Sequence, residues 1–181
     1  MAHLPVWYLG QIPEEDCNKA FEEFIKLPSQ DATMGKNSDH KDHSTRNTTI
    51  RFADKINWFG LQMLDFGTFA NTECKWNWDI NEYEAVQFAE YAINQKYNWH
   101  VDNFPLHGGN TDRKVTVVCL MNDPFEFEGG LLQLRLYNEY TPELKKGSII
   151  AFPSVIEHQV TPVTKGVRYT ATMWISGPRF K

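Results

Sequence analysis

The sequence predicts a mainly β protein of the α+β class, a double-stranded β-helix (jelly roll) with N-terminal helices packed on one face. Three observations favour this class. The length of 181 residues suits one domain with a sizeable core. Apolar residues recur at helical spacing within the first 75 residues. From Trp76 onward, short strand-like segments alternate with turn-rich ones, which is typical of a sandwich or barrel.

No repeat or low-complexity tract interrupts the chain, so we expect a single domain over residues 1–181. Residues 1–75 are expected to supply a strand, helices and a substrate loop, and residues 76–181 the core barrel. The loop is expected at Ser29–Asn47, which is polar and without periodicity. Long loops in compact domains often serve as lids or binding loops.

The first elements of this domain are a strand at Val6–Gly10 and two helices. The segment 13–28 opens with three acidic residues, which favour a helix N-terminus, and carries an apolar stripe that Pro28 would end. A second helix is predicted within residues 54–71. Its expected apolar stripe consists of Ile56, Phe59, Met63, Phe66 and Phe69.

Seven later segments have strand-like composition, and turn-rich sequences separate them. Gly129 and Gly130 are expected to permit a tight turn or a close backbone approach, so we interpret them as structural. The predicted strands are 76–80, 84–91, 114–122, 131–137, 147–154, 158–163 and 167–177.

Charge and composition exclude several classes of partner. A net charge of −5 without basic runs gives no electrostatic argument for nucleic acid. No apolar run is long enough to cross a bilayer, and the start of the chain lacks a signal-peptide pattern. Cys17, Cys74 and Cys119 are too few and too far apart for a disulfide framework or a thiolate zinc site. We therefore expect a cytoplasmic protein, located in the bacterial host if a phage carries it.

A metal site is predicted around His100 and Asp102, because residues two apart on a strand point to the same face. Alone, this pair also fits a surface hydrogen bond. His158 follows a distant strand-like segment and supplies a third ligand. Two histidines and one carboxylate form the facial triad that leaves positions open on iron(II), and no cysteine lies near either histidine.

Arg168 is the second chemical signal. On a barrel strand it would point inward together with Thr170, Thr172 and Trp174. A buried guanidinium is costly unless it meets an anion, and its planar fork suits a carboxylate. A dicarboxylate such as 2-oxoglutarate could span from the metal to this arginine. The alternative is an Arg168 that faces solvent or pairs with a structural acid such as Glu157.

These residues and their spacing resemble the iron(II)- and 2-oxoglutarate-dependent oxygenases, and most of all the prolyl 4-hydroxylase-like branch with its small bacterial and phage members. The resemblance extends from about Asn81 to Pro178, over half the chain. It rests on the His100-x-Asp102 pair and on the segments 125–134 (FEFEGGLLQL) and 142–177 (PELKKGSIIAFPSVIEHQVTPVTKGVRYTATMWISG).

The resemblance implies a dioxygenase that hydroxylates an unactivated C–H bond, with O₂ and 2-oxoglutarate as co-substrates and succinate and CO₂ as co-products. It implies that the two histidines and the aspartate bind iron(II), and that Arg168 binds the far carboxylate of 2-oxoglutarate. A tyrosine before the His-x-Asp pair would hydrogen-bond the co-substrate. Tyr91 matches by position, and Tyr97 is the nearby competitor. Ascorbate is the expected reductant.

The expected partner is a protein or peptide with a prolyl target, and a non-proline residue or a small molecule stays open. A cupin-like metal-binding or ligand-binding module without oxygenase activity is the alternative function. A cupin would more often carry a His-x-His pair with a glutamate, which this sequence lacks. The oligomeric state is left open.

Several residues near these motifs need an interpretation. Trp99, Phe104 and Trp174 are candidates for a shield around the reactive site, and Trp174 also for co-substrate contact. Core packing is the alternative for Trp99 and Phe104. Arg46 and Arg51 would line a substrate groove if the loop before them folds over the pocket. His107 is interpreted as a turn residue, and a solvated loop is expected for Asp39, His40, Asp42 and His43.

Overall fold

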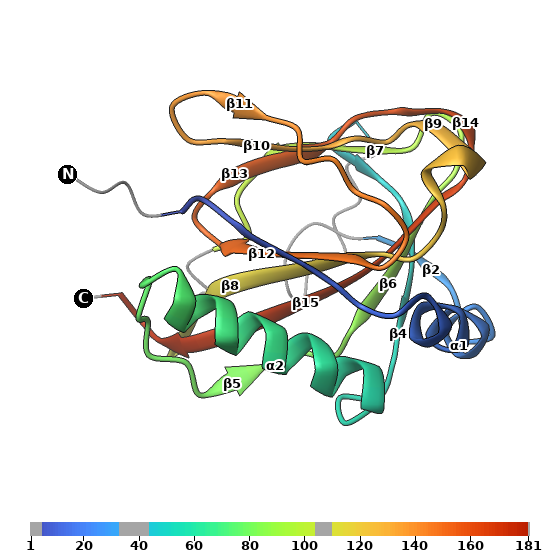
Figure 1. Cartoon of the computed structure of the whole chain (residues 1–181). Helices are drawn as coiled ribbons and strands as arrows, with labels where there is room; N and C mark the ends of the chain where they lie inside the picture. Colours follow the sequence, from blue (N-terminus) through green and yellow to red (C-terminus); the bar gives the residue numbers. More distant parts are fainter. Residues whose placement is uncertain (1–4, 33–43, 104–109, 181) are drawn as a thin grey trace.

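The computed structural model describes residues 5–32, 44–103 and 110–180, and these build two antiparallel sheets that face each other (Figure 1). The larger sheet is 8-stranded. Its strands lie in the order β1 (Tyr8–Gln11), β12 (Ser148–Pro153), β8 (Thr111–Leu120), β15 (Arg168–Pro178), β6 (Gln87–Tyr91), β4 (Thr49–Phe52) and β2 (Gln30–Asp31), and β5 (Glu82–Tyr83) also pairs with β15.

The smaller sheet is 5-stranded and closes over the larger one (Figure 1). A short 3-10 helix, η1 (Pro124–Glu126), and the pair β9 (Phe127–Gly129) and β14 (Val163–Gly166) lie at one end. This arrangement confirms the predicted jelly roll. The order of strands is β11 (Glu139–Tyr140), β10 (Leu132–Arg135), β13 (Glu157–Val160), β7 (Lys96–His100) and β3 (Arg46–Asn47).

The helices α1 (Glu14–Phe24) and α2 (Trp58–Glu73) both pack on the outer face of the larger sheet, as predicted (Figure 1). Phe24 of α1 contacts the rings of Phe59 and Phe88, which joins the two helices to strand β6. The inner face of this sheet is left free for a site between the sheets. Among the described residues, no helix has the length and apolarity that crossing a membrane requires.

The apolar stripe predicted for the second helix is only half right. Phe59 and Met63 are fully buried, but Phe69 is 52% exposed. Ile56 is 76% exposed, because the helix begins after the N-cap Asn57 and this side chain precedes it. Helical periodicity therefore located the element and misplaced part of its buried face.

Small residues complete that buried face. A Cβ at Gly67 would lie 2.5 Å from Cδ1 of Ile175 and 2.7 Å from Cγ2 of Val117. Because real Cβ atoms do not approach so closely, the absent side chain lets α2 lie directly on β8 and β15. The contact fixes the helix against the two central strands, which carry much of the site.

Six of the seven predicted strand segments contain a strand. Residues 76–80 form no strand, because the side chain of Asn71 bonds both the backbone N–H and the carbonyl of Trp78 and holds a loop. The first strand begins at Tyr8 rather than at Val6. Strands β3 and β4 were not predicted, since their polar sequence shows no clear alternation.

Candidate functional site

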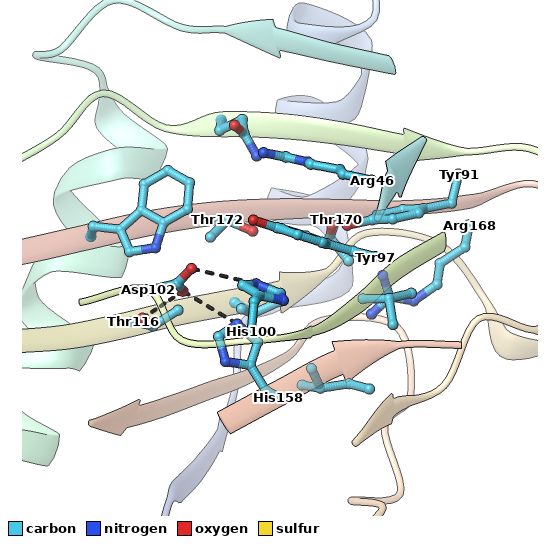
Figure 2. A pocket seen from close by; sticks show the side chains of 15 residues that line it. Arg46, Tyr91, Tyr97, His100, Asp102, Thr116, His158, Arg168, Thr170 and Thr172 are labelled. Carbon is cyan, nitrogen blue, oxygen red and sulfur yellow. Dashed lines mark hydrogen bonds and ion pairs between the residues drawn. The ribbon is translucent and has the colours of Figure 1, made fainter. Parts of the chain in front are cut away.

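One cleft between the two sheets gathers most of the polar side chains that the sequence singled out (Figure 2). Strands β7 and β13 of the smaller sheet face β6, β8 and β15 of the larger sheet across it. The cleft is therefore built by both layers of the jelly roll.

The two histidines come from neighbouring strands. His100 ends β7, and His158 on β13 is its paired residue across the ladder. Asp102 does not lie on the strand, contrary to prediction. The backbone N–H groups of Asp102 and Asn103 both donate to the Ser154 carbonyl, at 2.9 and 3.0 Å, and this turn directs the carboxylate toward the histidines.

The three side chains converge on one point. One ligand atom from each of His100, Asp102 and His158 can be chosen so that all lie within 4.8 Å of one another. The Nε2 atoms of the histidines lie 3.5 and 3.3 Å from the two oxygens of Asp102. Figure 2 shows both rings directed at the carboxylate. This is the cluster that the spacing predicted.

The remaining ring nitrogens set the orientation of both imidazoles. Nδ1 of His100 lies 2.7 Å from the Asn98 carbonyl, and Nδ1 of His158 lies 3.0 Å from the Ile156 carbonyl. Because a carbonyl only accepts, each Nδ1 must donate, and each Nε2 lone pair is available for a metal. Two imidazoles and one carboxylate so arranged fit a divalent cation such as iron(II).

Burial and mutual attraction decide the charges of this cluster. Burial favours the neutral form of Asp102, but His158 and His100 outweigh it and hold the pKa of the carboxyl well below its ordinary value. Burial lowers the pKa of His100. For His158, burial is outweighed by Asp102, and its pKa is raised. The cluster thus presents an ionised carboxylate to any cation.

Two hydroxyl groups that the sequence analysis missed support the carboxylate. Thr116 on β8 lies 2.9 Å from Asp102 through its Oγ1, and 2.9 Å from the Ser154 hydroxyl. All of these residues are buried. No local motif identifies such a threonine, because only the pairing of β8 with β12 brings it to the site.

A β-bulge in β7 turns two residues of that strand into the cleft. His158 pairs with His100 and Val160 with Tyr97, so Asn98 and Trp99 together oppose Gln159. Tyr97 and His100, three residues apart, therefore share one face, and their rings stack with centroids 3.4 Å apart. Burial raises the pKa of Tyr97 to about 12, so its phenol stays protonated at neutral pH.

Arg168 lies inside the cleft, 2% exposed, and has no carboxylate partner in the described part of the chain. Glu157, its considered alternative partner, pairs with Arg135 instead. Burial lowers the pKa of Arg168 to about 10, which leaves it charged at neutral pH. An unpaired buried guanidinium is the arrangement expected where an anionic ligand binds.

The surroundings of Arg168 leave it room and flank it with an aromatic ring. Tyr91 is its pairing residue on β6, and the guanidinium lies 5.4 Å from the Tyr91 ring centroid. Gly130, with φ of +58°, faces the arginine from the other side. A Cβ at this glycine would lie 2.8 Å from Cδ of Arg168. The predicted close backbone approach is thus made against this side chain.

Among the described residues, the predicted aromatic shield lies only partly in the cleft. Trp174 is buried and lines the cleft with Thr170 and Thr172. Trp99 does not line it, since the bulge directs this side chain to the outer surface, where Arg135 covers its ring at 4.1 Å. The assignment of Trp99 as a shield is therefore wrong.

The two arginines of the predicted substrate groove have different surroundings. Arg46 on β3 lines the cleft and is buried. Arg51 on β4 lies elsewhere and pairs with Glu90 at 2.8 Å. Four groups of the sequence analysis lie outside the described residues: Phe104, His107, the loop pair Asp39 and His40, and the pair Asp42 and His43.

Comparison with known proteins gives a family match over the barrel. A model of the 2OG-Fe(II) oxygenase superfamily matches residues 86–176, half of the chain. A PKHD-type hydroxylase of Thermosynechococcus vestitus is 38% identical over 92 residues. That alignment covers 49% of this chain and 41% of the relative, so the chain spans less than half the relative's length.

Two solved structures share the fold. A Pseudomonas putida prolyl-4-hydroxylase superposes with a TM-score of 0.68 at 18% identity, covering 96% of this chain and 94% of that one. A viral collagen prolyl hydroxylase from Paramecium Bursaria Chlorella virus-1, in its 2OG complex, gives 0.67 at 20% identity and covers 96% and 97%. At such identities these structures establish a common fold.

Proposed function

This chain belongs to the 2OG-Fe(II) oxygenase superfamily, and from this we propose that it is an iron(II)- and 2-oxoglutarate-dependent dioxygenase. Its reaction is the hydroxylation of an unactivated C–H bond, with a peptidyl proline as the proposed target. One observation supports this most strongly: His100, Asp102 and His158 converge in a cleft that also contains the unpaired Arg168.

The metal ligands in this proposal are the two histidine Nε2 atoms and the Asp102 carboxylate. Bound iron(II) supplies the oxidising chemistry by which O₂ and 2-oxoglutarate yield hydroxylated product, succinate and CO₂. The backbone carbonyls on both Nδ1 atoms hold the imidazoles in the ligating tautomer. The Thr116 hydroxyl orients the carboxylate.

Arg168 binds the far carboxylate of 2-oxoglutarate in this proposal, through the paired N–H groups of its guanidinium. Tyr91 flanks it and is the proposed tyrosine contact, since Tyr97 is stacked on His100 instead. Val118, Leu132 and Trp174 line the same cleft and exclude water from the reacting groups.

The proline target is supported by the names of similar proteins. The relative from Thermosynechococcus vestitus is a PKHD-type hydroxylase, and both structural neighbours are prolyl hydroxylases. The proposed partner is therefore a protein or peptide. The cytoplasm is the proposed compartment, because the three cysteines are free and buried.

The decisive experiment measures release of CO₂ from labelled 2-oxoglutarate with iron(II) and ascorbate, the proposed reductant, in the presence of prolyl peptides. Turnover with a mass increase of one oxygen in the peptide supports the proposal. A protein that binds metal without binding or consuming 2-oxoglutarate would instead be the cupin-like module.

Two variants separate the proposed roles. Asp102→Ala should abolish metal binding, whereas Arg168→Ala should weaken 2-oxoglutarate binding far more than metal binding. Calorimetric titration with Mn²⁺, and then with 2-oxoglutarate, measures both affinities. Equal loss of both affinities in both variants would indicate unfolding and would contradict these roles.

A further inference from the structure

We propose that Arg46 is the receptor for a carboxylate of the substrate, so that the molecules hydroxylated carry a carboxylate close to the reacting carbon. This inference rests on the proposed dioxygenase function and deepens it by naming a substrate class. The carboxylate could belong to a peptide C-terminus, to an acidic side chain or to a free amino acid, and the three share one chemistry.

Arg46 is a buried cation without a counter-ion among the residues that the structure describes. Its side chain lines the cleft, and the residue is 8% exposed. Its Nε has no hydrogen-bond partner among the described residues, and no described carboxylate forms an ion pair with it. A guanidinium withdrawn from water in this way is unfavourable until an anion joins it.

Other arginines near the cleft form ion pairs with acidic residues of the same chain. Arg51, on the next strand, pairs with Glu90 at 2.8 Å. Arg113 binds both oxygens of Glu84, at 2.6 and 2.7 Å. Within the described residues, Arg46 is left without such a partner, as is Arg168. The two unpaired guanidiniums are those that line the cleft.

Arg46 is close to the metal ligands and is separate from the Arg168 position. Its guanidinium lies 4.6 Å from the centroid of the Tyr97 ring, whose other neighbour is the His100 ring at 3.4 Å. One aromatic ring thus separates Arg46 from a metal ligand. In Figure 2 the Tyr97 side chain lies between those of Arg46 and Arg168.

The charges of the cleft leave a place for one further anion. A divalent metal and Asp102 together contribute one positive charge, and Arg46 and Arg168 contribute two more. The 2-oxoglutarate dianion neutralises two of these three charges. One positive charge remains in a poorly solvated cleft, and a substrate monocarboxylate would balance it.

A second donor in the cleft lacks an acceptor. Nε1 of Trp174 is buried and has no partner among the described residues. Arg113 covers one face of the indole at 3.8 Å, and that arginine is committed to Glu84. Two unpartnered, buried N–H groups on residues that line one small cleft favour an occupant rich in acceptor oxygens.

The test compares acids with their amides as ligands. The protein is loaded with Mn²⁺ and saturating 2-oxoglutarate, and calorimetry then measures the affinity for three probe pairs. The pairs are acetyl-Ala-Pro as acid or amide, acetyl-Pro-Asp-amide against acetyl-Pro-Asn-amide, and L-proline against L-prolinamide. We expect at least one acid to bind about tenfold more tightly than its amide, and the pair that does so identifies the source of the carboxylate.

Arg46→Gln should abolish this preference, and Arg46→Lys should keep only part of it because lysine lacks the planar fork. Arg51→Gln is the matched control and should keep the preference. The proposal is overturned if no acid binds better than its amide, or if Arg46→Gln retains the difference. It is also overturned if Arg46→Gln weakens 2-oxoglutarate binding as much as Arg168→Gln does, since Arg46 would then serve the co-substrate.

A failure of the proposed dioxygenase function can be distinguished from a failure of the Arg46 proposal. A wild-type protein that does not consume 2-oxoglutarate would end that proposal. The same acid and amide titrations with Mn²⁺ alone would then still decide whether Arg46 binds a carboxylate.

Discussion

Thr116 donates a hydrogen bond to Asp102, with 2.9 Å between Oγ1 and Oδ2. Because the carboxylate can only accept, the single hydroxyl proton of Thr116 is used there. The Ser154 hydroxyl, 2.9 Å from the same Oγ1, must then donate to Thr116. A chain of two hydroxyls thus holds the carboxylate between the two histidines.

Replacing Thr116 by valine keeps the shape of the side chain and removes this bond. We expect Thr116→Val to weaken Mn²⁺ binding about 10- to 100-fold, as loss of an outer partner of a metal ligand commonly does. Ser154→Ala removes only the more distant donor and should have a smaller effect. Calorimetry on both variants measures this order, and a Thr116→Val protein that binds as tightly as the wild type would contradict it.

Variants of Trp99 test whether the bulge in β7 turns this side chain away from the cleft. Since its ring lies under Arg135 on the outer surface, Trp99→Phe should leave the affinities for Mn²⁺ and 2-oxoglutarate close to those of the wild type. Trp174→Phe, which alters a residue lining the cleft, should change the binding of substrate peptides. Fluorescence or calorimetric titrations compare the two, and equal losses in both variants would place Trp99 in the cleft after all.

The convergence of His100, Asp102 and His158 could be predicted from sequence, whereas the groups that support them could not. His-x-Asp, a distant histidine and an inward arginine are spacing signals, and the resemblance to a known family ordered them. The position of Asp102 beyond the strand and the bulge at Asn98 and Trp99 depend on the register of β7 with β13. Register is set by pairing between distant strands, and a local sequence pattern does not predict it.

The second helix illustrates the same limit in packing. Its periodicity predicted an amphipathic helix. The predicted buried face was assigned to aromatic residues, however, and glycine was left out of it. Phe69 is exposed, while Gly67 lies directly against Ile175 and Val117 of the sheet. Hydrophobicity shows which residues can be buried, and the distance between helix and sheet decides which ones are.

That close approach predicts an unusual stability effect. Gly67→Ala would normally stabilise a helix by about 1 kcal/mol through intrinsic propensity. Here the new methyl group meets Ile175 and Val117, and overpacking of a core typically costs about 1–3 kcal/mol. We therefore expect a net loss in the free energy of unfolding, measured by urea denaturation.

The control for Gly67→Ala is the neighbouring exposed position on the same helix. Thr68→Ala places the same side chain on the solvent side, where it should leave stability unchanged or slightly raised. A Gly67→Ala protein as stable as Thr68→Ala would show that α2 shifts away from the sheet without loss.

Asn122 forms hydrogen bonds with the backbone of the residues before and after Arg168. Its Nδ2 donates to the Val167 carbonyl and its Oδ1 accepts from the Tyr169 N–H, both at 2.9 Å. One buried amide therefore fixes the residues on both sides of the arginine, where β15 begins. We infer that Asn122 is a positioning residue for Arg168.

Asn122→Ala should weaken 2-oxoglutarate binding about tenfold while leaving Mn²⁺ binding near the wild-type value. The proposed metal ligands lie elsewhere, since His100 is on β7, His158 is on β13 and Asp102 is in the turn after β7. The substitution should also cost about 1 kcal/mol of stability, since a partly buried N–H and a partly buried carbonyl lose their partners. Asp123→Ala is the control. It removes the cap of the neighbouring turn, where Asp123 accepts from the Phe125 N–H, and should destabilise without altering 2-oxoglutarate affinity. If both variants lose 2-oxoglutarate affinity equally, the effect follows from stability, and Asn122 has no positioning role.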